Sequence, residues 1–259
     1  PYGLAFDASN ILYVTMNNFR DWANVTRSWI FKINLTTLVA TEINVPGITF
    51  GHLYGCAFDS LGNFYVADNT NNKIIKITMV NYSTGTASIY ANLYSGLNQP
   101  TDICFDSFDN GYISNAGSIN IIKRGIDGTS SIFSTGYLHP VYTLAYDVTN
   151  NILYAAAFDY TSPIKGFLLR IINGETTIVP NNLGNPVNPH SLAITSEGQL
   201  CVTSISSVGS SQTGYITIYV MIPNNVVNKY SIDVSGNLGM SSVQFNASYT
   251  TLYASAYNT

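Results

Sequence analysis

The chain has 259 residues, of which 46% are hydrophobic and only 9% are charged, with a net charge of -4. Its ten Lys and Arg residues are scattered and form no basic cluster, which argues against nucleic-acid binding. No apolar run approaches the roughly 20 residues that a membrane-spanning helix needs, so no membrane span is expected.

The dominant feature of the sequence is a repeated unit made of a short apolar run, a turn and a second run that usually carries a tyrosine. In chain order the copies read "LAFDASNILYVT", "CAFDSLGNFYVA", "ICFDSFDNGYIS", "LAYDVTNNILYAA", "LAITSEGQLCVT" and "VQFNASYTTLYAS". Their turn anchors are Asp7, Asp59, Asp106, Asp147, Thr195 and Asn246, separated by 52, 47, 41, 48 and 51 residues. Because Asp and Asn side chains can bond the backbone two residues on, we predict turn residues here rather than calcium ligands.

Two further β-rich runs follow in each of the first five copies. These third and fourth strands are predicted at 29–35 and 37–43, 73–80 and 86–93, 119–125 and 130–136, 166–172 and 175–181, and 215–222 and 227–234. Four short antiparallel strands per copy, without a helical pattern, are typical of a β-propeller blade. We therefore predict an all-β fold, a six-bladed β-propeller of four-stranded antiparallel blades.

The whole chain, 1–259, is predicted to form a single propeller domain. The approximate blade limits are 1–50, 51–98, 99–140, 141–186, 187–239 and 240–259. The last copy stops after its second run, so the last blade is expected to be incomplete. The first residue is Pro1 and not Met, which suggests a processed or trimmed chain. A two-domain β-sandwich is the alternative, but it does not explain why the turn unit recurs six times along the chain.

The stretch "GCAFDSLGNFYVADNTNNKIIKI" at 55–77 resembles the NHL repeat. That repeat runs from an Asp-x-x-Gly-Asn turn to Tyr-Val-Ala-Asp and then to Asn-x-Arg/Lys-Ile. The second copy keeps Asp68, Asn72 and Lys73 of the later half, and the fifth and sixth copies depart furthest from the pattern. The resemblance implies a propeller, usually of six blades, and it implies no single activity.

The positions five residues before each anchor are predicted to surround one mouth of the central channel. These candidate ligand-binding residues are Tyr2, Tyr54, Thr101, Tyr142, His190 and Ser241. Their rings and hydroxyl groups could stack on and hydrogen-bond a small polar or sugar-like ligand. The alternative is that the tyrosines wedge between blades and expose only their hydroxyl groups.

All three histidines of the chain are expected near the same mouth. His52, His139 and His190, with Asp102, are a candidate metal set, since neutral imidazoles bind zinc. Channel histidines that bind zinc are implied by similarity to the amidating lyases related to NHL propellers. Similarity to the metal-dependent lactonase propellers would imply calcium, but Thr101 and His190 stand where that family can place a carboxylate. The main expectation is that these are solvent-exposed or turn histidines and that no cofactor is bound, with zinc or calcium in the channel as the alternative.

Two kinds of surface feature are also predicted. The insertion at 17–28 carries Arg20, Trp22 and Arg27, residue types that often anchor a partner, so it is a candidate partner-binding loop. Asn24, Asn34 and Asn81 stand in N-x-Ser/Thr sequons and are candidate glycan acceptors, together with the less favourable Asn246.

These features lead to an expected function and an alternative. The expected function is a non-catalytic binding or scaffold propeller with a protein or carbohydrate partner, extracellular or on a particle surface such as that of a large virus. Low charge, a neutral polar coat and the scarcity of channel carboxylates favour it. The alternative is a metal-dependent lyase or hydrolase with its site at the channel mouth. The oligomeric state is not indicated by the sequence.

Overall fold

A computed structural model describes the backbone of residues 2–20, 26–134, 139–159, 165–179, 189–195, 197–208, 211–222, 225–234 and 238–258. Side chains are described for 2–17, 27–134, 139–159, 166–179, 189–195, 197–203 and 242–255. The fold is all-β apart from two three-residue 3-10 helices, η1 (Leu93–Ser95) and η2 (Ala116–Ser118), among these residues. Neither helix is long and apolar enough to cross a membrane.

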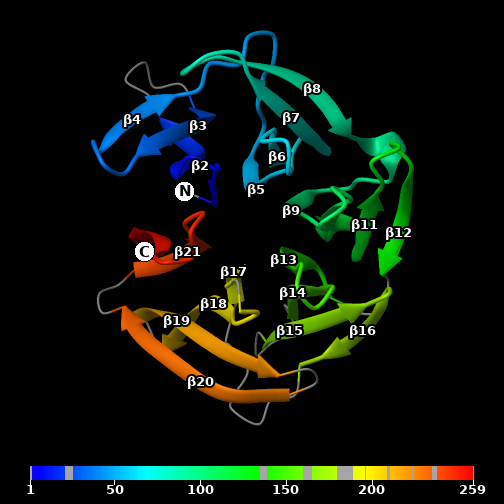
Figure 1. Cartoon of the computed structure of the whole chain (residues 1–259), viewed down its shortest axis with the longest axis vertical. Helices are drawn as coiled ribbons and strands as arrows, with labels where there is room; N and C mark the ends of the chain where they lie inside the picture. The colour runs from blue at the N-terminus through cyan, green and yellow to red at the C-terminus, as the bar shows by residue number, and fades with distance from the viewer. Residues whose placement is uncertain are drawn as a thin grey trace.

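The strands form antiparallel sheets of consecutive strands, arranged around a central axis as in a β-propeller (Figure 1). The first two sheets contain β1 (Gly3–Phe6), β2 (Ile11–Arg20), β3 (Thr26–Asn34) and β4 (Val39–Glu42), then β5 (Leu53–Phe58), β6 (Phe64–Asp68), β7 (Lys73–Met79) and β8 (Gly85–Ala91). The next two contain β9 (Pro100–Phe105), β10 (Gly111–Asn115), β11 (Asn120–Arg124) and β12 (Ser130–Ser134), then β13 (Val141–Asp147), β14 (Ile152–Asp159), β15 (Lys165–Ile172) and β16 (Glu175–Ile178).

The remaining strands form one larger and one smaller sheet. The larger contains β17 (Pro189–Ile194), β18 (Leu200–Val208), β19 (Ser211–Ile222) and β20 (Asn225–Val234). The smaller contains β21 (Leu238–Phe245) and β22 (Leu252–Asn258). The prediction of a six-bladed propeller is therefore corrected. The described residues form five four-stranded blades, and the last sheet has two strands, so it is not a sixth blade of the same kind.

The two-stranded sheet nevertheless closes the ring, because β21 contacts both β17 and β1. A hydrogen bond from the backbone N–H of Ala247 to the Asn10 side chain, 2.9 Å long, links the last turn to the first. The rings of Phe6 and Tyr253 pack across the same seam with centroids 5.1 Å apart. The innermost strands β1, β5, β9, β13, β17 and β21 thus surround a channel.

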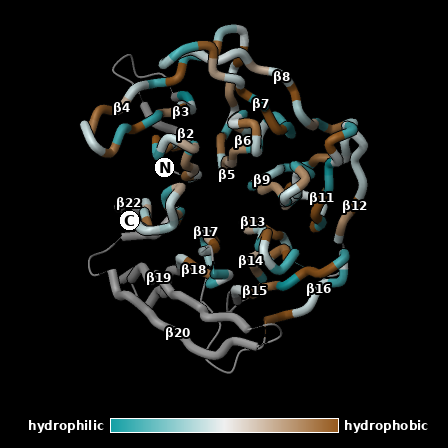
Figure 2. The backbone as a smooth tube through the Cα atoms, viewed as in Figure 1, coloured by the Kyte–Doolittle hydropathy of each residue, from teal (hydrophilic) through white to brown (hydrophobic). Residues whose placement is uncertain are grey.

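The hydrophobic core lies between neighbouring blades. Ile30 of the first blade packs in one cluster with Phe64 and Ile75 of the second, and Ile74 packs in the next cluster with Ile113 of the third. Hydrophobic residues accordingly follow the strands around the ring instead of gathering on one side (Figure 2). Each blade is apolar on both faces because each face is covered by a neighbour.

The repeated turn residues act as the sequence predicts. The Asp59 carboxylate accepts hydrogen bonds from the N–H groups of Leu61 (3.1 Å) and Asn63 (2.8 Å), from the Asn63 side-chain amide (2.7 Å) and from the Tyr65 hydroxyl (2.9 Å). The other anchors accept backbone N–H groups two to five residues on in the same way, namely Asp7, Asp106, Asp147, Thr195 and Asn246. The prediction of turn residues is confirmed.

Replacing Asp59 by Ala is expected to lower the free energy of unfolding by about 1–2 kcal/mol, because partly buried N–H and O–H donors lose their acceptor. Urea unfolding of the variant measures this loss. Asp59→Asn keeps one acceptor oxygen and is the matched control, with a smaller expected loss. Equal stability of Asp59→Ala and the parent chain would contradict the structural role of the turn.

The cysteines are free thiols, and each lies in an innermost or second strand. Cys56 and Cys201 are buried, and Cys104 is partly buried. Burial raises the pKa of Cys56 and Cys104 well above the ordinary thiol value, and it raises the pKa of Cys201 to about 12. All three are therefore protonated at neutral pH and behave as small hydrophobic residues.

Candidate functional site

The innermost strands enclose a cavity of about 650 Å³ that runs along the channel. At one end, here called the tyrosine end, it is lined by Tyr2, Tyr54 and Tyr142. At the other, here called the turn end, it is lined by Val148 and Tyr249, which follow the turn anchors. A cavity of this size is ordinary for a small-molecule site in a protein.

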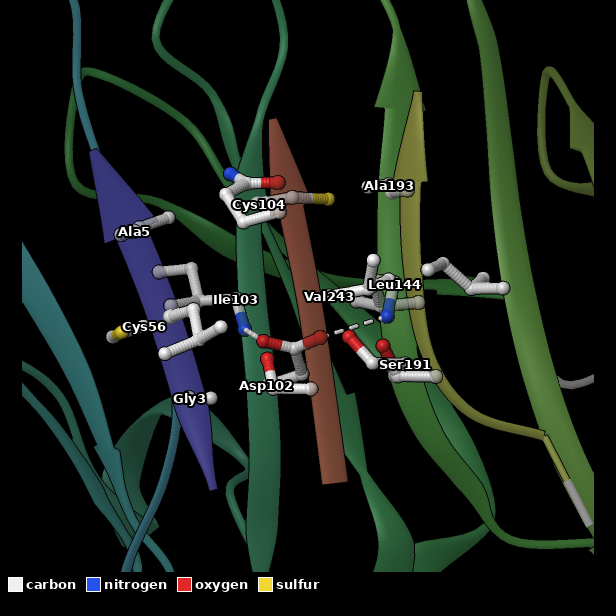
Figure 3. A pocket seen from close by; sticks show the side chains of 18 of the residues that line it. Gly3, Ala5, Cys56, Asp102, Ile103, Cys104, Leu144, Ser191, Ala193 and Val243 are labelled. Carbon is white, nitrogen blue, oxygen red and sulfur yellow. Dashed lines mark hydrogen bonds between the residues drawn. The ribbon is translucent and has the colours of Figure 1, made fainter. Parts of the chain in front are cut away.

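A ring of small and polar residues stands four positions before the anchors and lines the cavity. This polar ring consists of Gly3, Gly55, Asp102, Thr143, Ser191 and Ser242. Figure 3 shows Gly3, Asp102 and Ser191 at one level of the channel, with Ala5, Cys104 and Ala193 two residues further along their strands. Among the described residues that line the cavity, Asp102 is the only carboxylate, and no Lys or Arg is present.

The Asp102 carboxylate is held by neutral donors from two strands. One oxygen accepts the N–H of Ile103 on its own strand, and the other accepts the N–H of Leu144 on β13, each at 2.9 Å (Figure 3). The Thr143 side chain also hydrogen-bonds to it. The carboxylate is thereby fixed in position, and no cationic side chain among the residues lining the cavity neutralises it.

Glycine on the neighbouring strand makes room for this carboxylate. A Cβ atom on Gly55 would lie 1.9 Å from Asp102 Oδ1 and 2.5 Å from its Cγ, distances that no side chain can tolerate. Asp102 thus fits its site because the preceding blade has no side chain there. The two residues form one unit that spans the junction between β5 and β9.

The environment of Asp102 changes its acidity. Burial away from bulk water raises the pKa of this carboxyl from 3.8 to about 7, and the hydrogen bonds from Leu144, Ile103 and Thr143 only partly oppose the rise. At neutral pH the group therefore exchanges a proton readily, which is the property required of a general acid or base. Strongly shifted carboxyl groups in cavities are characteristic of active sites.

The tyrosine end contains most of the ligand-binding residues that the sequence predicts. The Tyr2 and Tyr54 rings lie 5.0 Å apart, and Phe158 contacts both Tyr142 and His190 at centroid distances of 5.3 and 5.8 Å. Burial lowers the pKa of His190, so its imidazole is neutral at pH 7. This end offers aromatic faces, phenol groups and one neutral imidazole.

The other two predicted members of this set behave differently. Thr101 lines the cavity but is buried, and its hydroxyl bonds to Ser114 at 2.8 Å and to the Val141 carbonyl at 3.2 Å, so it ties neighbouring blades together. The side chain of Ser241 lies outside the described residues.

The four candidate metal ligands are not brought together. Asp102 and His190 line the cavity, whereas His52 and His139 do not. His139 stacks on Phe167 and lies 3.7 Å from an Asp159 carboxylate oxygen. In the part of the chain that the structure describes, no group of three or more His, Cys, Asp or Glu side chains is placed to hold a metal ion.

The predicted surface features fall only partly within the structure. Asn24, Trp22 and the side chain of Arg20 lie outside the described residues, and the Arg27 guanidinium stacks over Trp29 at 5.4 Å. The sequon residues Asn34 and Asn81 each accept two backbone N–H groups in turns. Partner binding by this loop, glycosylation and an extracellular or particle-surface location stay predictions.

Fold and channel together define this chain as a β-propeller. No protein-family model matches the sequence, and no curated protein matches it. Solved structures do match in fold. Aldose sugar dehydrogenase from Streptomyces coelicolor, in its PQQ-bound form, has a TM-score of 0.70 at 16% identity, over 98% of this chain and 87% of the other.

Two further neighbours have the same architecture. The protein XC5397 from Xanthomonas campestris, described as a gluconolactonase, has a TM-score of 0.68 at 12% identity, over 98% of this chain and 82% of the other. Virginiamycin B lyase from Staphylococcus aureus has a TM-score of 0.60 at 17% identity, over 99% and 91%. At such low identity the likeness establishes the fold alone.

The expectation of a non-catalytic scaffold is nevertheless corrected by these findings. The neighbouring propellers are a dehydrogenase, a lactonase and a lyase. The channel of this chain also contains a carboxyl group with a pKa of about 7. Both observations favour the catalytic alternative.

Proposed function

We propose that this chain is an enzyme whose active site is the channel, and that it catalyses a lyase or hydrolase reaction on a small molecule by general acid–base catalysis. The observation that carries the proposal is Asp102, a fixed carboxyl group with a pKa of about 7 in a cavity of about 650 Å³. The enzymatic propellers of similar fold support it.

The chemistry follows from two titratable groups that line the cavity and whose acidity burial changes, Asp102 and His190. Asp102 can take a proton from, or give one to, a reacting group at the level of the polar ring. His190, neutral at pH 7, can accept a proton at the tyrosine end. The hydroxyl groups of Thr143 and Ser191 lie on neighbouring strands of the polar ring and can orient a polar substrate. Either group can activate water for hydrolysis or remove a proton in an elimination.

A metal-dependent mechanism is not supported by the residues present. A catalytic zinc or calcium needs several convergent ligands. Of the candidate set only Asp102 and His190 line the cavity, and both Asp102 oxygens already accept backbone N–H groups. The reaction is therefore derived from protein groups alone.

The experiment compares the parent chain with Asp102→Asn on two cyclic esters, with mass spectrometry of the products. They are gluconolactone and quinupristin, the compound present in a solved structure of virginiamycin B lyase from Staphylococcus aureus with a TM-score of 0.61 to this chain. Hydrolysis adds one water to the ring-opened product, whereas elimination leaves the mass unchanged. We expect turnover of a cyclic ester by the parent chain and a loss of about 10²–10⁴-fold in kcat/KM in Asp102→Asn. The parent rate should change with pH near 7.

Ser60→Ala, on the surface of the propeller, is the control variant and should keep full activity. Turnover that is unchanged in Asp102→Asn, or no turnover of any cyclic ester, would overturn the proposal.

We also propose that the repeat is an NHL repeat, on the basis of the second blade. Asp68 is fully buried and accepts the N–H of Gly51 at 3.1 Å and the Asn71 side-chain amide at 2.9 Å. The Asn72 side chain accepts the N–H of Gln99 at 2.6 Å and so links this blade to the segment that enters the next. The polar residues of the repeat's second half therefore have structural roles that favour this assignment.

A further inference from the structure

We propose that the substrate is an amphipathic molecule without a negative charge that places its polar reacting group beside Asp102 and an apolar ring-bearing group at the turn end of the channel. The location of the reacting group rests on the proposed function. The preference for an apolar group rests on a different part of the cavity, which contains no acid–base residue.

The wall of the cavity becomes mostly apolar along the strands, although Gln244 on β21 and the turn residue Asn246 also line it. Beyond the polar ring, small residues such as Ala5, Cys104 and Ala193 follow (Figure 3). The positions next to the anchors form an apolar collar, here defined as Phe6, Phe58, Phe105, Tyr146, Ile194 and Phe245. The apolar collar lies three positions after the polar ring, about 10 Å along an extended strand, so one small molecule can reach both.

Rings of the apolar collar are packed against aromatic residues of the second strands. Phe58 packs against Tyr13 and Phe64 at centroid distances of 4.9 and 5.1 Å, and Phe105 packs against Tyr65 at 4.7 Å. Each of these rings is held from behind by the second strand of a blade while it lines the cavity. A preformed aromatic surface binds an apolar group without the entropic cost of ordering its own side chains.

The rim at the turn end extends this surface to the solvent. Val148 and Tyr249 line the cavity although 57% and 47% of their surfaces are exposed. Leu61 and Phe108 occupy the corresponding turns of two other blades and are 81% and 73% exposed, but they do not line the cavity. The chain thus contains two rim residues to test and two matched residues outside the cavity.

The charges of the cavity argue against an anionic substrate. The described residues that line it include no Lys or Arg, and their one carboxylate is Asp102. An anion in this enclosed site would lose its hydration without gaining a cationic partner. An uncharged polar group can instead hydrogen-bond to Asp102 and to the hydroxyl groups beside it.

The test uses three unreactive probes, namely N-benzylacetamide, acetamide and the carboxylated analogue 4-(acetamidomethyl)benzoate, with affinities measured by NMR titration. We expect N-benzylacetamide to bind at least about tenfold more tightly than acetamide, because its ring removes apolar surface from water. The carboxylated analogue should lose most of this gain. Equal affinities of N-benzylacetamide and acetamide, or of N-benzylacetamide and its carboxylated analogue, would overturn the proposal.

Variants locate the binding surface. Val148→Ser combined with Tyr249→Asn should reduce the preference for the benzyl group severalfold, and Asn suits the positive φ of 56° at position 249. Leu61→Ser combined with Phe108→Ser should leave the preference unchanged, and a loss of equal size in both pairs would contradict the assigned surface. Asp102→Asn should keep the benzyl preference. If the parent chain shows no turnover but still prefers the benzyl probe, the proposed function is refuted and the proposed substrate preference stands.

Discussion

Asp102→Ser is expected to abolish a decrease in stability between about pH 4 and about pH 7 that the raised pKa of Asp102 predicts for the parent chain. The pKa of this carboxyl is about 7 in the folded protein and 3.8 in its unperturbed form, so the folded state holds the proton more tightly between these values. The contribution is most favourable below pH 4, declines through this window and is constant above it. Three pKa units correspond to at most about 4 kcal/mol.

Serine is a natural choice of replacement, since Ser191 and Ser242 occupy the same position on their own strands. Urea unfolding at pH 4.5 and pH 8 measures the difference for parent and variant. Asp127→Ser is the matched control, because Asp127 is exposed, its pKa is lowered by hydrogen bonds from Thr129, and its removal leaves the decline in place. An unchanged decline in Asp102→Ser would mean that the carboxyl is not shifted upward in the folded protein.

Gly55→Ala is expected to reduce activity by about 10²-fold or more, because a catalytic group displaced by about 1 Å loses that much. The new Cβ atom would meet Asp102 Oδ1 at 1.9 Å and the Asp102 Cα at 3.0 Å, so the carboxylate must leave its position. Overpacking of this kind also costs about 1–3 kcal/mol of stability. Kinetics at several pH values should show a changed pH dependence in addition to the lower rate.

Gly3→Ala separates this effect from general destabilisation. Its Cβ atom would meet the Tyr54 carbonyl at 2.6 Å and Thr15 Oγ1 at 2.9 Å, but Asp102 is not among its nearest neighbours. It should lose stability while keeping the pH-linked decline that Asp102 causes. In the double variant Gly55→Ala/Asp102→Ser, the cost of the alanine should fall because the clashing carboxylate is gone. Additive losses would contradict a direct contact between positions 55 and 102.

The repeat made much of the fold predictable from sequence. Anchors such as Asp59 and Asp106 fix hairpin turns through local hydrogen bonds, and local bonds follow from short sequence patterns. The count of six blades was wrong, because the described residues form five four-stranded sheets, whereas the two strands of the last sheet agree with a last copy that stops after its second run. That sheet contains only β21 and β22 among the described residues.

The candidate site was predictable only in part, for a reason of register. The repeat pattern indicated the residues five positions before the anchors, which include Tyr54 and Tyr142. The polar ring lies one position later, and a shift of one residue along a strand selects the opposite face. The apolar collar was missed because the sequence does not distinguish a phenylalanine that lines a cavity from one that is buried in the hydrophobic core. The glycine at position 55 gave the one available signal, since glycine in a strand often marks close approach by another group.

The pairing of Gly55 with Asp102 makes the acidic group a property of two blades, although only one carries it. A single substitution can introduce a buried carboxylate into a blade only if the preceding blade already has glycine at the same position of its innermost strand. Here β1 and β5 carry glycine at that position, whereas β13 and β17 carry Thr143 and Ser191. A carboxylate at this position of β17 or β21 would therefore take two coordinated changes, because the preceding strands carry Thr143 and Ser191, whereas β5 follows Gly3 and would need only one.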